Sequence, residues 1–229
     1  MVLVNPRTSI MQKHLAAYNM DVKRRHFLLF LFTLFLGTAF HHGWAASAPV
    51  IACFGNSLTA GYGVSPGHSY PDELQKLLDA RGYHYRVANL GVSGNTSKDG
   101  TDRLKDVLAL RPQIVILEFG GNDGLRGLPL NATKQNLEAM IAALQKAGVK
   151  VVLAGITLPP NYGPDYIQQF NNIYTSLAKK YRTPLIPFLL QSVYGVPGSM
   201  QEDGIHPTAQ GCRQVALNVF QALRSLLNK

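Results

Sequence analysis

Five short apolar runs follow one another along the chain beyond residue 48. They are PVIACF (49–54), YRVANL (85–90), IVILEF (114–119), KVVLAGI (150–156) and PLIPF (184–188). Continuous apolar runs of this length, many of them β-branched, are typical of strands that are covered on both faces. The pattern therefore predicts five buried strands in a parallel sheet.

Between these runs, apolar residues recur at the spacing of three and four that makes one stripe on a helix. The stripes are Leu74, Leu77 and Leu78; Leu137, Met140, Ile141 and Leu144; and Cys212, Val215, Ala216, Val219 and Leu223. Ser69 and Asp72 resemble a capped helix start, and Gly148 resembles a helix stop. Strands that alternate with helices imply right-handed crossovers. We therefore predict one α/β domain, with a five-stranded parallel sheet between two helical layers.

The first 45 residues follow a different pattern. Lys23-Arg24-Arg25 precedes the apolar run FLLFLFTLFLGTAF (27–40), which is followed by small residues. This order is typical of a secretory signal peptide. A membrane helix usually needs roughly 20 apolar residues, so a retained anchor is the weaker alternative. We expect cleavage after Ala45, a single domain over residues 46–229, and a periplasmic or secreted protein.

The charge of the chain depends partly on this leader. The formal charge is +9, and residues 1–45 hold five of the 22 basic residues but one of the 13 acidic ones, which leaves +5 for residues 46–229. No basic run interleaved with aromatic residues remains, so nucleic acid is not an expected partner. A transient contact with an anionic lipid surface stays open. Cys53 and Cys212 lack metal or redox spacing, and whether they pair is left open.

Residues with chemical potential gather in four loops. These are Gly55-Asn56-Ser57, Ser93-Gly94-Asn95-Thr96, Gly120-Gly121-Asn122-Asp123 and Asp203-Gly204-Ile205-His206-Pro207. The first three follow predicted strands, and in a parallel sheet ligands bind at the carboxyl ends of strands. We therefore expect the loops to face one crevice.

A serine hydroxyl is a poor nucleophile until a positioned base takes its proton, and that base is usually a histidine oriented by a carboxylate. Four of the seven histidines lie in the leader, leaving His68, His84 and His206. Only His206 has a carboxylate in a tight local motif, Asp203 three residues before it. Taken alone, such an aspartate often just caps a turn.

Acyl transfer also needs donors where negative charge develops on the carbonyl oxygen. Gly94 can offer a backbone N–H at close approach, and Asn122 can offer an uncharged side-chain donor. Each has an ordinary alternative, a turn glycine or an asparagine that holds its own loop. The combination of Ser57, Gly94, Asn122 and an Asp-x-x-His motif is far more specific than any single residue.

These residues, in this order and at these strand ends, resemble the SGNH (GDSL) hydrolase family over residues 49–227. GGNDGLRG (120–127), LPPNYG (158–163) and DGIHP (203–207) are similar to its bacterial periplasmic thioesterase I, arylesterase and lysophospholipase branch. The resemblance implies a flavodoxin-like three-layer α/β/α sandwich and a serine esterase or thioesterase. It implies no metal and no organic cofactor.

Carried over residue by residue, the resemblance implies that Ser57 is the nucleophile, His206 the general base and then acid, and Asp203 the residue that orients His206. The backbone N–H groups of Ser57 and Gly94 and the side chain of Asn122 would form the oxyanion hole.

The loop after Asn122 would bind substrate through Leu125, Arg126 and Leu128, with an ordinary connecting loop as the alternative. Outside the cytosol, short or medium acyl esters, aryl esters or lysophospholipids are more plausible substrates than acyl-CoA. We expect a monomer that acts on small acyl esters or thioesters.

One position departs from the family pattern. Its first block usually reads Gly-Asp-Ser, whereas this chain has Gly55-Asn56-Ser57. Asparagine keeps an acceptor oxygen but loses the charge and gains a donor, so we predict that Asn56 holds the turn without adding charge. A non-catalytic lipid-binding descendant and a carbohydrate O-acetyl esterase remain as alternatives. The only tryptophan, Trp44, lies in the leader, which disfavours a sugar-binding groove.

Overall fold

A parallel sheet forms the centre of the fold in the computed structural model, which describes residues 48–228. Its strands are β1 (Val50–Gly55), β2 (Arg86–Gly91), β3 (Ile114–Glu118), β4 (Lys150–Ala154) and β5 (Leu185–Ile186), in the order β2-β1-β3-β4-β5. All five predicted strands are present, but β2 lies at one edge of the sheet and is partly exposed, so the prediction that it is buried on both faces was wrong. Strand β5 has only two residues, because Pro184 and Pro187 flank it and proline has no N–H for strand pairing.

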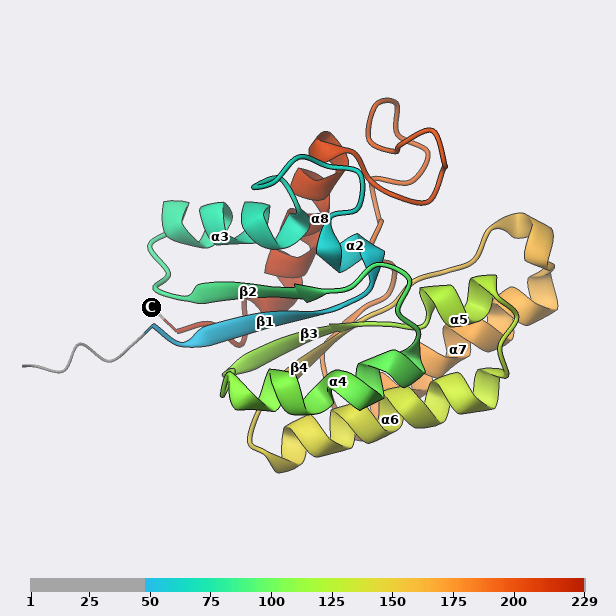
Figure 1. The fold of residues 1–229 in the computed structure, drawn as a ribbon, viewed down its shortest axis with the longest axis horizontal. Helices are drawn as coiled ribbons and strands as arrows, with labels where there is room; N and C mark the ends of the chain where they lie inside the picture. Colours follow the sequence, from blue (N-terminus) through green and yellow to red (C-terminus); the bar gives the residue numbers. More distant parts are fainter. Residues whose placement is uncertain (1–47, 229) are drawn as a thin grey trace, which may run out of the picture. The chain divides into compact units, whose positions relative to one another are not determined.

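Helices cover both faces of this sheet, which gives the predicted three layers (Figure 1). Helices α3 (Tyr70–Ala80) and α8 (Ala209–Leu223) pack together on one face. Helices α4 (Ser97–Ala109), α6 (Leu130–Lys146) and α7 (Pro164–Tyr181) cover the other. Short helices α2 (Ser57–Ala60), α5 (Gly121–Leu125) and η1 (Pro160–Tyr162) follow the carboxyl ends of β1, β3 and β4.

The helix ends follow the sequence signals. Ser69 and Asp72 form the predicted capping box of α3. Gly148 follows the end of α6 with a left-handed φ of 79°, a conformation that costs glycine little. Between residues 48 and 228, no helix is both long and apolar enough to cross a membrane. The predicted extension, residues 1–45, lies outside the described part of the chain.

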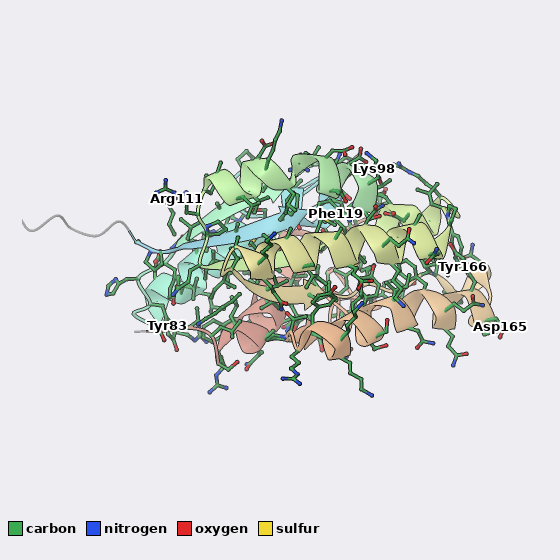
Figure 2. The ribbon with its side chains drawn as sticks, turned by 90° about the horizontal axis from the view of Figure 1, so that it is seen from below. Tyr83, Lys98, Arg111, Phe119, Asp165 and Tyr166 are labelled. Atoms are coloured by element: carbon green, nitrogen blue, oxygen red, sulfur yellow. The ribbon has the colours of Figure 1, made fainter. Side chains whose placement is uncertain are left out.

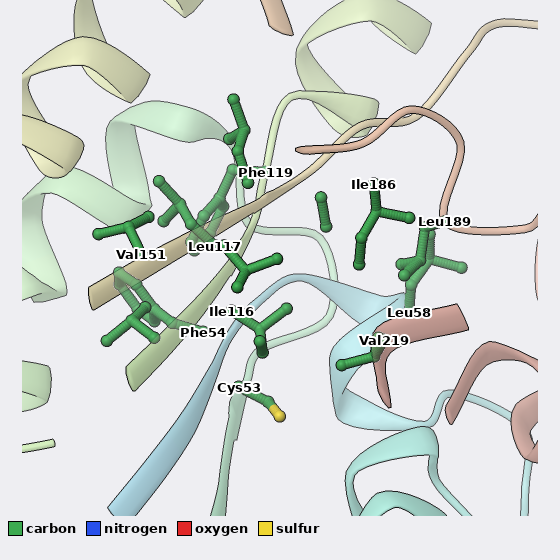
Figure 3. Close-up of a cluster of buried hydrophobic side chains, with 14 of the residues drawn as sticks. Cys53, Phe54, Leu58, Ile116, Leu117, Phe119, Val151, Ile186, Leu189 and Val219 are labelled. Atoms are coloured by element: carbon green, nitrogen blue, oxygen red, sulfur yellow. The ribbon is translucent and has the colours of Figure 1, made fainter. Parts of the chain in front are cut away.

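The core lies on both faces of the sheet, because successive strand residues point to opposite sides. Phe54 of β1 packs edge-to-face on Phe119, with ring centroids 4.8 Å apart, while Cys53 points to the face where Val219 of α8 lies (Figure 3). Charged side chains such as Lys98 and Asp165 are at the periphery of the molecule (Figure 2).

The two cysteines of the domain are buried, and both are free thiols. Burial raises the pKa of Cys53 to about 12 and that of Cys212 to about 11. Because the thiolate is the reactive form, both side chains act as small apolar residues of the core.

Candidate active site

Four loops meet beyond the carboxyl ends of the strands, at the end of the sheet where α2 and α5 lie (Figure 1). Ser57, Gly94, Asn122 and His206, one from each loop, line a single cavity of about 420 Å³. The structure thus brings together the four segments that the sequence expected to share one crevice.

Ser57, His206 and Asp203 form a continuous chain of hydrogen bonds. The Oγ atom of Ser57 lies 2.8 Å from Nε2 of His206, and Nδ1 of His206 lies 2.6 Å from Oδ2 of Asp203. An ionised carboxylate at Nδ1 makes this nitrogen the protonated one, so that Nε2 can accept the serine proton. The arrangement can therefore activate Ser57 as a nucleophile.

The carboxyl group of Asp203 is held in its ionised form. Burial raises its pKa, but hydrogen bonds from the backbone and ring of His206 and from the backbone of Ile205 outweigh burial, and the pKa falls below its usual value. The Oδ1 atom accepts the N–H groups of Ile205 at 2.9 Å and of His206 at 3.0 Å. The carboxylate thus shapes its own loop as well as orienting the imidazole.

Gln201 fastens this loop to the segment that follows Ser57. Its backbone N–H donates to the carbonyl of His206 at 2.8 Å. Its side-chain Nε2 donates to the carbonyls of Tyr62 at 2.7 Å and Pro207 at 2.9 Å. The ring of Tyr62 in turn lies against the His206 imidazole, with centroids 4.7 Å apart. These contacts help to set the position of His206 relative to Ser57.

The three residues predicted to form the oxyanion hole, Ser57, Gly94 and Asn122, line the cavity. Within residues 48–228, the backbone N–H groups of Ser57 and Gly94 donate to no other group. The Nδ2 atom of Asn122 donates to the carbonyl of Asn95 at 2.8 Å, which orients the amide and leaves its second hydrogen for a ligand. Gly94 has a φ of 83°, a conformation that favours glycine.

Two side chains hold together the segments that carry Gly94 and Asn122. The buried carboxylate of Asp123 accepts the N–H of Ser97 at 2.9 Å and its Oγ at 2.5 Å, which joins the loops after β3 and β2. The guanidinium of Arg126, expected beside a substrate head group, donates to the carbonyl of Gly94 at 2.9 Å. Its observed contact is thus with the loop after β2.

The turn that carries Ser57 rests on a residue that sequence reasoning missed. Asn56 caps α2 by accepting the N–H of Leu58 at 3.0 Å, and its Nδ2 donates to Oε1 of Glu118 at 2.8 Å. Glu118 ends β3 and is 1% exposed, and burial raises its pKa to about 7. The available signal was a glutamate inside the otherwise apolar run IVILEF.

Beyond Ser57 the cavity is mostly apolar. Its wall includes Leu125, Ile156, Leu158, Phe188 and Leu190, of which the sequence identified only Leu125. The sequence also expected Leu128 here, but this residue lies outside the lining and is 38% exposed. The site therefore combines a serine, an imidazole, backbone and amide N–H donors and an apolar cavity.

An α/β/α sandwich with this serine after β1 and this aspartate and histidine before α8 places the chain among the serine hydrolases. The sequence pattern of the GDSL-like Lipase/Acylhydrolase family matches residues 53–214, and the chain belongs to this family. The family predicted from the motifs is thereby confirmed.

Named relatives agree with this assignment. The chain is 43% identical over 183 residues to "Esterase TesA" of Pseudomonas aeruginosa, covering 80% of this chain and 91% of that protein. It is 37% identical over 185 residues to "Thioesterase 1/protease 1/lysophospholipase L1" of Escherichia coli K12, covering 80% and 88%. The solved structure "Crystal Structure of TesA" has a TM-score of 0.75 at 43% identity, covering 78% and 99%. The chain is a hydrolase of carboxylic esters or thioesters, and its substrates are small molecules.

Proposed function

We propose that hydrolysis proceeds by two-step acyl transfer on Ser57, with His206 as general base and then acid and Asp203 orienting His206. The N–H groups of Ser57 and Gly94 and the amide of Asn122 bind the oxyanion. The observation that carries the assignment is the unbroken hydrogen-bond chain from Oγ of Ser57 to the carboxylate of Asp203.

In the first step, Oγ of Ser57 attacks the carbonyl carbon while Nε2 of His206 takes the hydroxyl proton. The carbonyl oxygen becomes negative and accepts hydrogen bonds from the oxyanion donors. The imidazolium then gives its proton to the departing alcohol or thiol. In the second step His206 deprotonates a water that attacks the acyl-serine, and the carboxylic acid leaves as Oγ regains the proton.

We propose that the cavity holds the acyl chain. Its volume of about 420 Å³ lies within the range of roughly 300–1,000 Å³ that is usual for small-molecule sites. Leu125, Ile156 and Leu158 offer apolar surface close to Ser57, and burial of each methylene of a ligand contributes about 0.8 kcal/mol. Short and medium acyl esters, lysophospholipids among them, are the substrates that this wall favours.

The test is steady-state hydrolysis of p-nitrophenyl esters from acetyl to palmitoyl, beside Ser57→Ala as control. We expect serine-dependent turnover that is highest for medium chains, and a burst of p-nitrophenol that Ser57→Ala abolishes. A maximum confined to acetyl would favour the aryl or carbohydrate esterase instead. A burst that persists in Ser57→Ala would remove this residue from the nucleophile role.

We also propose that residues 1–45 direct export and are removed, and that the enzyme acts outside the cytosol as a monomer. The support is the basic, apolar and small-residue order of the leader. Fractionation of cells, sequencing of the mature N-terminus and light scattering test this. Cytosolic protein that retains residues 1–45 would contradict it.

A further inference from the structure

Glu118 is a buried acid that the acyl-transfer steps do not use. Its carboxylate accepts three hydrogen bonds from the turn that carries Ser57. Oε1 accepts Nδ2 of Asn56 at 2.8 Å, and Oε2 accepts the backbone N–H of Asn56 at 3.1 Å and Oγ1 of Thr59 at 2.9 Å. The three donors come from residues on both sides of the serine, so the carboxylate spans the nucleophile turn.

The chain leaves space for this carboxylate at Gly55. A Cβ atom at Gly55 would lie 2.5 Å from Oε2 of Glu118 and 2.2 Å from Oγ1 of Thr59. Both distances are too short for real contacts, so a side chain at this position would displace the carboxylate or the hydroxyl. The close approach of β1 to Glu118 is thus built into the backbone.

Hydrogen bonds, rather than cations, surround the Glu118 carboxylate. Among the described residues, the titratable side chains that interact with it electrostatically are Tyr70 of α3 and Tyr174 of α7. Burial raises the pKa of both phenols well above 10, so both are neutral wherever the enzyme works. The hydroxyl of Thr59 also lies 3.2 Å from the Tyr70 hydroxyl, which completes the polar cluster.

The amide of Asn56 matches this carboxylate in a way that neither an aspartate nor a second amide would. Asn56 donates to Glu118 through Nδ2 while its Oδ1 accepts the N–H of Leu58. An aspartate at position 56 would bring two carboxylates together, and the pair would have to hold one proton. A glutamine at position 118 would carry one NH2 group in place of a carboxylate oxygen. In either orientation of the side chain, this group would face a donor of Asn56, either its Nδ2 or its backbone N–H.

We propose that Glu118 is a positioning residue for Ser57, and that Asn56 and Glu118 act as one amide–carboxylate pair that holds the nucleophile turn. This inference rests on the nucleophile role proposed for Ser57. The negative charge that the usual aspartate would bring to position 56 is supplied here from β3 once Glu118 is ionised, above pH about 7. Exchanging the two groups should therefore preserve function, whereas changing one alone should not.

The experiment is a double-mutant cycle with Asn56→Asp, Glu118→Gln and the combined variant. The matched control is Glu138→Gln of α6, a partly buried glutamate that pairs with Lys180 and does not line the cavity. The readouts are kcat and KM for one p-nitrophenyl ester across a pH series. We expect Glu118→Gln to lower kcat at least tenfold above pH about 7, where Glu118 of the wild type is ionised, with KM little changed. The combined variant should recover most of this loss, because the glutamine at position 118 then donates to the aspartate at position 56.

The Asn56→Asp variant adds a pH signature that simple loss of packing would not produce. Its two carboxylates share a proton, which is lost as pH rises, and the charges then repel each other. We expect activity near that of the wild type at low pH and a decline toward alkaline pH that the wild type and the combined variant lack.

Two results would overturn the proposal. One is a combined variant no more active than Glu118→Gln, and the other is a pH profile of Asn56→Asp that parallels the wild type. Should Glu118→Gln fail to fold, the profile of Asn56→Asp still decides. Failure of the nucleophile assignment is separate, because it would appear as a burst that survives Ser57→Ala.

Discussion

The side chain of Gln201 donates a hydrogen bond of 2.7 Å to the backbone carbonyl of Tyr62, across 139 positions of sequence. Tyr62 lies just past the short helix that begins with Ser57, and Gln201 precedes the loop of Asp203 and His206. The contact thus joins the nucleophile segment to the segment that holds its base.

Without the hydrogen bond from Gln201 to Tyr62, His206 should be less well positioned relative to Ser57. We expect Gln201→Leu to lower kcat about tenfold, equivalent to ~1.4 kcal/mol in the barrier, and the free energy of unfolding by only about 1 kcal/mol. Single-turnover acylation and urea denaturation measure the two effects. Gln191→Leu, at an exposed position, is the control, and equal acylation rates in both variants would refute a positioning effect.

Removing the charge of Asp203 should lower activity more than removing the side-chain contact of Gln201. Asp203→Asn keeps the shape but removes the charge that holds the proton on Nδ1 of His206. Removal of this charge in the serine-protease triad lowers kcat by about 10⁴-fold, and we expect a loss of about 10³-fold or more in kcat/KM here. The ester assay described above measures it. A loss of less than about tenfold would mean that His206 is oriented by other contacts.

The titration of Asp203 should also affect stability at acid pH. Its pKa is below the usual value in the folded chain, so its ionised form stabilises the fold above the unfolded pKa near 3.8. This contribution is lost as pH falls through the lower, folded value. Denaturant unfolding of wild type and Asp203→Asn over this range measures it, and parallel curves for the two proteins would contradict the expectation.

Glu118 should make the free energy of unfolding depend on pH in the opposite direction. Burial raises its pKa from 4.5 to about 7 in the folded chain, so its stabilising contribution is complete below about 4.5 and is lost as pH rises through about 7. At 1.36 kcal/mol for each pH unit between the two pKa values, the stability lost amounts to about 3 kcal/mol. Urea unfolding over this interval should show the slope in the wild type. In Glu118→Gln the slope should be absent, and its persistence would assign it to another group.

Two leucines that the sequence alone could not distinguish differ in whether they line the cavity. Leu125 lines the cavity and Leu128 does not. We expect Leu125→Ala to shift the preferred acyl length and to lower kcat/KM for medium chains roughly 15- to 60-fold, as the loss of two to three methylene contacts at about 0.8 kcal/mol each would do. Leu128→Ala should leave the profile unchanged. A shift in acyl-length preference in Leu128→Ala alone would mean that the acyl chain binds beside Leu128 and not beside Leu125.

The strands and the main helices were predictable because burial imposes a period on the sequence. Runs such as IVILEF can only be covered on both faces, and stripes such as that of α6 can only face a core. The four site loops were predictable for a related reason, since strand ends bring them to one edge. The length of β5 also follows from Pro184 and Pro187, although the apolar pattern alone predicted a longer strand.

The supporting contacts were not predictable. Glu118 and Asn56 are 62 positions apart, and no local pattern states that one accepts from the other. Whether Leu125 or Leu128 faces the cavity depends on the direction of each side chain at the end of a five-residue helix. Arg126 likewise reaches the carbonyl of Gly94, a contact that requires the packed loops to be known.

The shortness of β5 affects how readily one molecule can associate with another through the edge of its sheet. A sheet edge with a long row of free N–H and C=O groups is a template on which another chain can add a strand. Here the edge strand has two residues, and the prolines on either side bring no N–H to the row. This edge of the sheet is therefore guarded against intermolecular strand addition, including while newly folded molecules are crowded together.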